Sequence, residues 1–166
     1  MRKPRPMQRS DRELSREDTL EILETRRFAS LATVDADGAP YVIPISYVMM
    51  DGKLYVHTGT AHGHFYENVT RDNRVCLTVV GEDAPIQRPG YGATRFASVV
   101  AAGRIYSVED PILFKQALVK LAQKYWPKLK KEVGSIINNQ LDVTAVWSIE
   151  LDEVRGKGRH RDEDIL

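Results

Sequence analysis

The fold is decided by the stretch FASLATVDADGAPYVIPISYVMMDGKLYVHT, residues 28–58. Three runs rich in apolar and β-branched residues are separated by Asp35-Ala36-Asp37-Gly38 and by Asp51-Gly52, and both separators have the composition of tight turns. We therefore expect strands at Phe28–Val34, Pro40–Met49 and Lys53–Thr58. Short turns between consecutive strands predict an antiparallel meander.

On either side of this meander, helices alternate with strands. Ser15 followed by Glu17 and Asp18 is typical of a helix start, and Asp110-Pro111 predicts another. The further expected elements are helices to about Arg26, over Gly63–Arg71, over Glu109–Trp126 and to about Asn138, strands at Asn73–Gly81, Thr94–Val108 and Thr144–Val154, and a loop at Glu82–Gly92. Gly103, inside the fifth strand, predicts a bulge or bend.

Six mostly antiparallel strands with peripheral helices predict a mainly β (α+β) fold, a small barrel flanked by helices. We expect one domain at 14–155, between a flexible arm at 1–13 and a charged tail at 156–166. The single cysteine, Cys76, lies in an apolar run and is expected to be a buried strand residue.

Composition bounds the classes of function. The chain has 166 residues and a formal net charge of +1, so no strong field favours nucleic acid or a membrane surface. The basic residues from Arg155 to Arg161 lack interleaved aromatics, which favours a solvated tail over a nucleic-acid patch. No signal peptide or membrane span is predicted, and one cysteine cannot form an internal disulfide, so we expect a cytoplasmic protein.

Polar residues are densest at His57-Thr58-Gly59-Thr60-Ala61-His62-Gly63-His64. Hydroxyls, imidazoles and backbone N–H groups at a helix start form an anion site suited to phosphate, whereas a polar loop with helix-capping threonines is the plainer interpretation. The histidine spacing matches no standard zinc motif, so no metal site is predicted. Ser46 and Ser98 lack a nucleophile motif, and Asp35 and Asp37 are explained by turn chemistry.

A series of short motifs resembles the FMN-binding split β-barrel proteins of the pyridoxamine 5'-phosphate oxidase-like superfamily, nearest their nitroimidazole-resistance (Nim-type) branch. It covers roughly residues 15–155. The motifs, in order, are Leu31-Ala32-Thr33-Val34, Asp37-Gly38-Ala39-Pro40-Tyr41-Val42-Ile43-Pro44, Leu54-Tyr55-Val56-His57, Gly63-His64, Asn68, Arg74-Val75, Val79-Val80-Gly81-Glu82, Ser98-Val99-Val100, Gly103-Arg104 and Val108-Glu109-Asp110-Pro111.

The resemblance implies a six-stranded antiparallel split β-barrel that forms a homodimer with FMN at the interface. It implies that the second strand contacts the flavin ring, that the segment after the third strand holds the phosphate, that a polar residue of the fifth strand touches the flavin, and that Trp147 approaches it from the partner subunit or serves the core. The implied cofactor residues are Val42, Ile43, Pro44, Ile45, Ser46, His57, Thr58, Thr60, Gly63, His64, Ser98 and Trp147.

The implied activity is an FMN-dependent oxidoreductase that acts on a small oxidised substrate, with nitroaromatic reduction as one form. If a side chain acts as acid or base, His64 is the first choice and His57 the second. The alternative is a flavin- or haem-binding protein without turnover, with haem held through the histidine cluster. Phe65 departs from the lysine that many Nim-type sequences carry after the Gly-His pair, which removes a cationic phosphate contact.

Overall fold

The computed structural model describes residues 6–159, which form six strands and four α-helices. The strands are β1 (Phe28–Val34), β2 (Pro40–Met50), β3 (Lys53–Gly59), β4 (Arg74–Arg88), β5 (Tyr91–Ser107) and β6 (Thr144–Arg159). The helices are α1 (Arg16–Thr25), α2 (His64–Arg71), α3 (Pro111–Tyr125) and α4 (Val133–Asn138). In these residues, every helix is too short or too polar to traverse a lipid bilayer.

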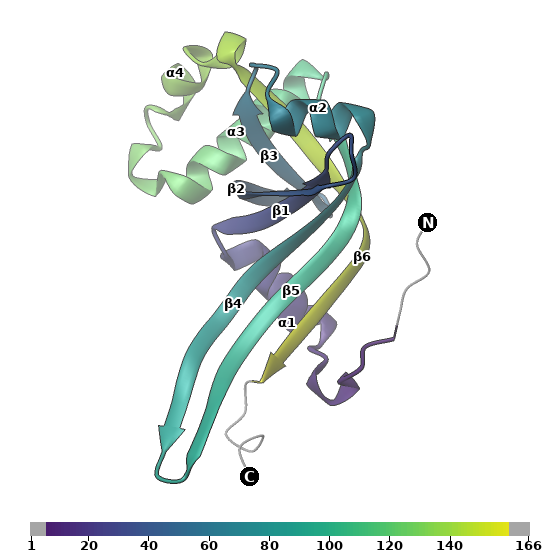
Figure 1. The fold of residues 1–166 in the computed structure, drawn as a ribbon. Helices are drawn as coiled ribbons and strands as arrows, with labels where there is room; N and C mark the ends of the chain where they lie inside the picture. The colour runs from purple at the N-terminus through teal and green to yellow at the C-terminus, as the bar shows by residue number, and fades with distance from the viewer. Residues whose placement is uncertain (1–5, 160–166) are drawn as a thin grey trace.

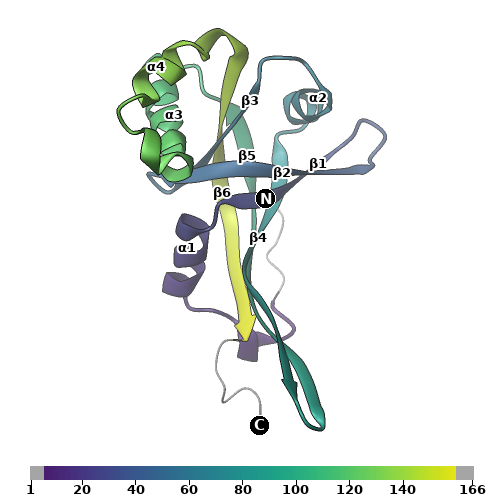
Figure 2. The ribbon, with the colours of Figure 1, turned by 90° about the vertical axis from the view of Figure 1, so that its left-hand side faces the viewer.

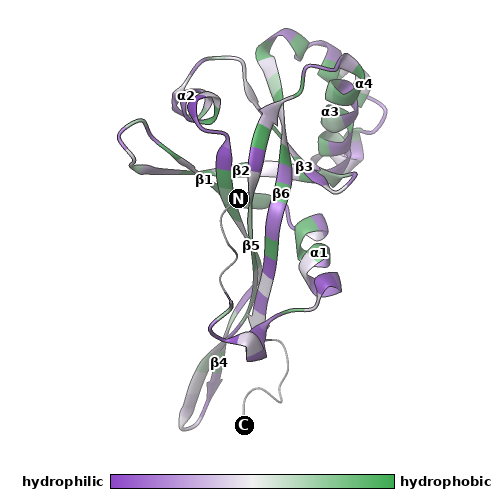
Figure 3. Ribbon diagram, turned by 90° about the vertical axis from the view of Figure 1, so that its right-hand side faces the viewer, coloured by the Kyte–Doolittle hydropathy of each residue, from purple (hydrophilic) through white to green (hydrophobic). Residues whose placement is uncertain are grey.

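The six strands close into an antiparallel barrel, as predicted, and their order around it is β1-β2-β3-β6-β5-β4. Along each strand the inward side chains are apolar and the outward ones are more polar, and Figure 3 shows this alternation along β6. Leu31, Leu54, Val56, Val99 and Ile149 are fully buried in the barrel core. This burial fixes the register, because a one-residue slip would expose the whole set.

The meander forms where residues 28–58 predict it. Asp51 and Gly52 both have positive φ, 52° and 76°, which is the type I′ turn that matches the twist of a two-residue hairpin. Ser15 caps α1 by accepting from the Asp18 N–H at 3.0 Å, and Asp110 caps α3. These local signals therefore set the ends of the elements that they were expected to set.

The helices cover different parts of the barrel. Helices α3 and α4 pack on the outer face of β2 and β3 around Val48, Tyr55 and Val146, while α2 lies on the other side of the same end (Figure 2). Helix α1 packs lower, against β4, β5 and β6. The barrel therefore has a helix-covered face beside β2 and β3 and an outer face over β1, β2, β4 and β5.

The prediction of a loop at 82–92 is wrong. Strand β4 continues to Arg88 and β5 begins at Tyr91, so the two strands extend past the barrel as a long arm (Figure 1). Pro85 and Pro89 suggested a loop, but a two-stranded arm has solvent on its outer edges, where a missing N–H costs little. A register shift between Val80 and Glu82 marks where the arm leaves the barrel.

The last strand is longer than predicted, so residues 156–159 belong to the fold and not to a charged tail. Strand β6 runs to Arg159, which pairs with Phe96, and the Leu14 N–H donates to the Gly156 oxygen at 3.1 Å. A Cβ on Gly156 would clash with Thr19, so this glycine permits close packing and does not mark a loose end. Residues 160–166 lie outside the described part. Of the predicted arm, residues 1–5 also lie outside it, whereas Ser10–Arg12 forms a 3₁₀ turn and Glu13 bridges to Lys157.

Two single-residue predictions have opposite outcomes. Gly103 lies at a register shift between β5 and β6, and a Cβ there would meet the Glu150 backbone, so the predicted bulge is confirmed. Cys76 lies on β4 as predicted, but it is exposed, so its predicted burial is wrong. Val75 and Leu77 take the inward positions of that strand, which turns Cys76 outward.

Candidate functional site

The barrel opens between β2 and β3. Within the described residues, the pairing of these strands ends at Tyr47↔Val56. Beyond that pair, residues 40–46 of β2 pair with β1 alone, and residues 57–59 of β3 pair with β6 alone. The two strands therefore diverge and leave one edge of β2 facing the opening.

The hairpin geometry determines which backbone groups face this opening. Met50 and Lys53 flank the two-residue turn and form its closing hydrogen-bonded pair. Because backbone direction alternates along a strand, the C=O groups of Ser46, Pro44 and Val42 then point toward the β3 side, as do the N–H groups of Ser46 and Val42. Pro40 and Pro44 fit this phase, because their missing N–H groups fall on the unpaired side and not in the β1 ladder.

On the β1 side of β2, opposite the opening, Tyr125 of α3 bonds to Tyr47 just beyond the first β1–β2 pair, Phe28↔Ser46. Its hydroxyl accepts from the Tyr47 N–H at 2.9 Å and donates to the Arg27 carbonyl. Tyr47 is buried and the ammonium of Lys124 lies 4.2 Å from its ring centroid. Burial, together with the nearby charge of Arg27, lowers the pKa of Lys124 to about 8. Helix α3 therefore completes the β1 side of β2 at Tyr47, while the β3 side of residues 40–46 stays open.

His57 and Thr58 project from opposite faces of β3. The Thr58 hydroxyl accepts from the Trp147 indole N–H at 3.0 Å and donates to the Gly59 oxygen at 3.1 Å. Trp147 is 4% exposed, so the structure gives it the core role of the two that were predicted. His57 instead faces α3 and α4, where partial desolvation of its ring lowers its pKa below the ordinary value although the residue keeps exposed surface.

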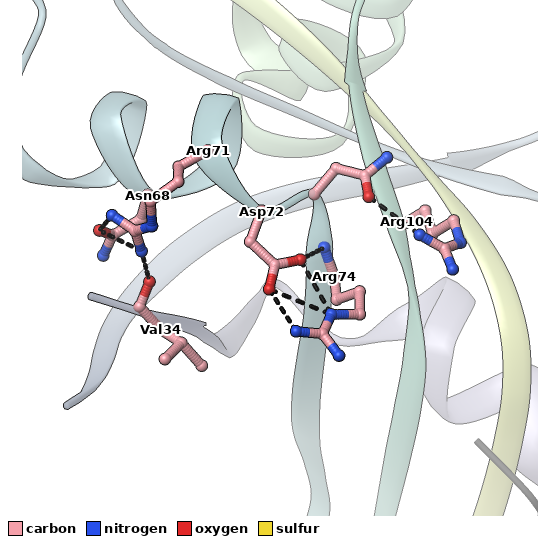
Figure 4. A network of polar contacts seen from close by, with 7 residues as sticks. Val34, Asn68, Arg71, Asp72, Arg74 and Arg104 are labelled. Carbon is pink, nitrogen blue, oxygen red and sulfur yellow. Dashed lines mark hydrogen bonds and ion pairs between the residues drawn. The ribbon is translucent and has the colours of Figure 1, made fainter. Parts of the chain in front are cut away.

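His64, the predicted acid or base, begins α2 and pairs with Asp35. Its Nε2 lies 2.8 Å from the Asp35 carboxylate, and its ring lies 4.1 Å from that of Tyr41. The same carboxylate accepts from the Asn68 amide at 2.6 Å. Arg71 donates to the Val34 carbonyl, as Figure 4 shows. This network fixes the start of α2 beside the end of β1.

The rest of the predicted phosphate segment remains accessible. Thr60 and Gly63 are exposed, and Gly63, the N-cap of α2, provides no side-chain cap for the N–H groups of the first turn. An anion can be held by such uncapped N–H groups. Phe65, where the resemblance implies a lysine, is buried and lies edge-on to Trp147 with 5.8 Å between ring centroids. Residue 65 therefore serves the core here.

The structure brings together part of the predicted site. Ser46 and His57 lie at the opening, with Val42 and Pro44 exposed beside it and Ile43 and Ile45 turned to the barrel core. Ser98 lies on β5, which β1 and β4 separate from β2, so one chain does not bring it to the opening. The sequence analysis missed Tyr125, Trp126 and Gln140, which face the opening from the helical layer. Their helical spacing indicated core packing and gave no signal of a site.

Within the described residues, no three histidine, cysteine or acidic side chains lie close enough together to share a metal ion. The groups that could hold a cofactor are therefore the peptide edge of β2, the start of α2 and the side chains around His57. This set binds by hydrogen bonds and apolar contact, and it suits a planar heteroaromatic ring with an attached phosphate.

Residues 15–158 match the family described as Pyridoxamine 5'-phosphate oxidase. The chain belongs to this family. The match spans most of the barrel, including the β2 edge, the start of α2 and all of β6 except its last residue. No curated protein matches the chain.

Solved structures share the fold. A protein of Bacteroides thetaiotaomicron named for 5-nitroimidazole antibiotic resistance is 21% identical with a TM-score of 0.73, over 87% of this chain and 85% of that one. An FAD-binding protein of Mesorhizobium loti is 25% identical with a TM-score of 0.61, over 89% and 97%. An FAD- and haem-binding protein of Mycobacterium smegmatis is 21% identical with a TM-score of 0.73, over 91% and 77%. The structural neighbours of this chain therefore include proteins named for binding FAD or haem.

Proposed function

We propose that this protein binds FMN along the open edge of β2 and acts as a homodimeric oxidoreductase on a small oxidised molecule in the cytoplasm. The observation that carries the proposal is the unpaired edge at residues 40–46. Val42 and Ser46 offer N–H groups there, and the C=O groups of Val42, Pro44 and Ser46 face the same side. A flavin ring presents alternating acceptors and donors along its polar edge, so this peptide edge can satisfy it.

The phosphate of FMN fits the start of α2 in this arrangement. The exposed Thr60 hydroxyl and the first-turn N–H groups after Gly63 supply donors. The imidazolium form of His64 would add positive charge there, although its Nε2 already pairs with the Asp35 carboxylate. Phe65 contributes nothing to the phosphate, so we expect weaker FMN binding than in a relative with lysine at this position.

A homodimer would cover the outer face of the barrel. Four exposed side chains, Phe28, Val42, Val80 and Val100, lie on four adjacent strands of this face. The register places Pro44, Ser30, Thr78 and Val100 in one row across β2, β1, β4 and β5. A continuous face of apolar and small residues is typical of a protein–protein contact. Because Val42 and Pro44 belong to both this face and the opening, a second copy would approach the flavin.

When bound, the flavin supplies electron transfer between a reduced donor and an oxidised substrate. The chain's own groups position the ring through β2 and limit water access through the helical layer. His57 is the imidazole next to the opening and can exchange a proton there. Nitroaromatics are the first substrates to test, and His64 as acid or base stays a prediction.

Haem is the second candidate, because one structural neighbour binds both FAD and haem. His57 would be the ligand, since it keeps exposed surface and a neutral imidazole is favoured by its environment. A Soret band in the purified protein, with no saturable response to FMN, would support haem and contradict the flavin proposal.

The test is a titration of the purified protein with FMN, followed by absorbance and by flavin fluorescence. Val42→Pro removes the N–H that faces the opening, and Val42→Ala keeps it while shortening the side chain. We expect Val42→Pro to weaken FMN binding about tenfold and Val42→Ala to stay within about threefold of the wild type. Equal affinities for the two variants, with unchanged thermal stability, would contradict binding at this edge.

The dimer has its own test in size-exclusion chromatography with light scattering. Val100→Arg places a charge in the apolar outer face, whereas Val143→Arg makes the same change at an exposed position between α4 and β6. We expect Val100→Arg to give a monomer and Val143→Arg to stay dimeric. A monomeric wild type, or a dimer that Val100→Arg leaves intact, would contradict the proposed interface.

A further inference from the structure

A cavity of about 400 Å³ lies where β2 and β3 part, under the helical layer of α3 and α4. Ser46 and His57 form its strand side, and the helices form its opposite wall. Its lining residues are Ser46, His57, Leu118, Leu121, Ala122, Tyr125, Trp126, Ile136, Ile137, Gln140 and Thr144. Its volume is in the range of small-molecule sites.

The lining is apolar over most of its surface and polar at one end. Leu118, Leu121, Ala122, Ile136 and Ile137 supply the aliphatic wall, and Tyr125 and Trp126 add aromatic surface. Two polar groups of the lining already have partners within the chain. The Tyr125 hydroxyl accepts from the Tyr47 N–H, and the Thr144 hydroxyl donates to the Gln140 carbonyl at 2.7 Å. The polar end is therefore formed by His57, Ser46 and the Gln140 amide.

The cavity disfavours ions. Its lining residues come from β2, β3, α3, α4, β6 and the segments beside the helices, and His57 and Tyr125 are the titratable ones among them. Desolvation lowers the pKa of His57, so its surroundings disfavour the charged imidazolium. A charged ligand group would lose its hydration without gaining an opposite charge.

We propose that this cavity binds an uncharged, flat, mostly apolar small molecule, with one polar group directed at His57 and Ser46. An aromatic ring suits the wall formed by Tyr125 and Trp126. Ser46 lines the cavity with its side chain, and its backbone belongs to the open edge of β2, so the ligand would lie beside a flavin bound at that edge. The binding of such a molecule in the cavity does not depend on the proposed function. Its role as the substrate does rest on the proposed flavin-dependent activity.

The binding test uses two dyes that share a phenylnaphthylamine body. N-phenyl-1-naphthylamine is neutral, and 8-anilinonaphthalene-1-sulfonate carries a sulfonate. Each is titrated into the purified full chain and followed by its own fluorescence on direct excitation. We expect saturable binding of the neutral dye and at least about tenfold weaker binding of the sulfonate. Equal affinities would overturn the proposed preference for uncharged ligands.

Matched variants then locate the neutral dye. Ile136→Trp fills the cavity, and Ile112→Trp makes the same change at an exposed position of α3 outside it. We expect the first variant to weaken binding about tenfold and the second to leave it unchanged. If the first folds poorly, His57→Gln is measured instead. Wild-type affinity should fall as the pH drops through the His57 pKa, and the variant should lose this dependence. Unchanged affinity in Ile136→Trp, or an unaltered pH profile in His57→Gln, would overturn the site.

A titration with FMN present separates this inference from the proposed function. Retained dye binding at saturating FMN supports two adjacent sites. Competitive displacement of the dye by FMN would assign the cavity to the flavin and overturn a separate ligand site. Dye binding without any FMN uptake would support the cavity and contradict the proposed flavin function.

Discussion

The two ends of the β2–β3 pair differ although they belong to the same strands. From Tyr47↔Val56 to Met50↔Lys53 the strands pair with each other, and α3 covers their outer face. From residue 46 toward residue 40, β2 has a partner on one side and exposes Val42 and Pro44. The closed end holds the fold and the open end leaves peptide groups available for a ligand.

This difference has a backbone cause. A β-strand carries N–H and C=O groups on both edges, and the groups of an unpaired edge can bond to another chain or to a ligand. Prolines at 40 and 44 block part of that edge from pairing with another strand, because each lacks an N–H. The open end thus resists aggregation while Val42 and Ser46 keep the donors that a ring edge can use.

The largest expected effect comes from one substitution made at both ends. Val56→Ala, at a fully buried position of the closed end, should lower the free energy of unfolding by about 2 kcal/mol through lost burial and a cavity. Val42→Ala, at an exposed position of the open end, should change it by less than about 0.5 kcal/mol. Urea unfolding measures both. Equal losses would contradict the division of β2 into two ends.

The next effect concerns the Tyr125 hydroxyl, which joins Tyr47 of β2 to Arg27 at the start of β1. Tyr125→Phe leaves the Tyr47 N–H and the Arg27 carbonyl without this partner, which should cost about 1–2 kcal/mol in unfolding free energy. Tyr106→Phe, at an exposed tyrosine of β5, is the matched control and should be neutral. If thermal denaturation shows no difference between the two variants, the Tyr125 hydroxyl does not stabilise this junction of β1 and β2.

The smallest effect depends on pH. The pKa of Lys124 is about 8 in the folded protein and lies near 10.5 when the chain is unfolded, so the unfolded chain holds more protons between these values. Stability from this group should therefore rise with pH from about 8 to 10. Lys124→Met should raise stability at pH 7 by about 1 kcal/mol after allowance for solvent screening and flatten that rise.

Lys120→Met, at an exposed lysine of the same helix, is the control for charge removal. Unfolding curves at pH 7, 8 and 9 are compared, below the range in which the raised pKa of buried Tyr47 acts in the opposite direction. A pH slope that Lys124→Met leaves unchanged would refute the assignment to Lys124.

Local signals were enough to predict the turn of the closed end and the starts of two helices and a bulge elsewhere. The Asp51-Gly52 turn, the Ser15 and Asp110 caps and the Gly103 bulge each depend on a few neighbouring residues. The strand residues at 82–88 and 91–93 and the end of β6 were not predicted, because proline and glycine were interpreted as loop residues. In the folded protein, the glycine at 156 permits contact with Thr19, which is far away in the sequence.

The candidate site was predicted in part for a related reason. Residues 57–64 are contiguous in sequence, yet strand alternation sends Thr58 to the barrel core and His57 to the helical layer, while α2 carries His64 to Asp35. Because successive side chains of a strand point to opposite faces, the sequence could have predicted that His57 and Thr58 face different sides of the third strand. The docking of α3 and α4 that forms the cavity depends on tertiary packing, and helical periodicity alone does not indicate which of their buried residues face a ligand.

The central claim is that the β3-facing edge of β2 is open and receives a flavin, and residue-resolved amide hydrogen exchange tests it most directly. In the protein without added FMN, the Val42 and Ser46 amides should exchange fast, while the Ile43 and Ile45 amides in the β1 ladder should exchange slowly. Saturating FMN should slow Val42 and Ser46 and leave the other two unchanged. Val42 and Ser46 amides that are already protected without FMN, or that stay fast at saturation, would contradict the account.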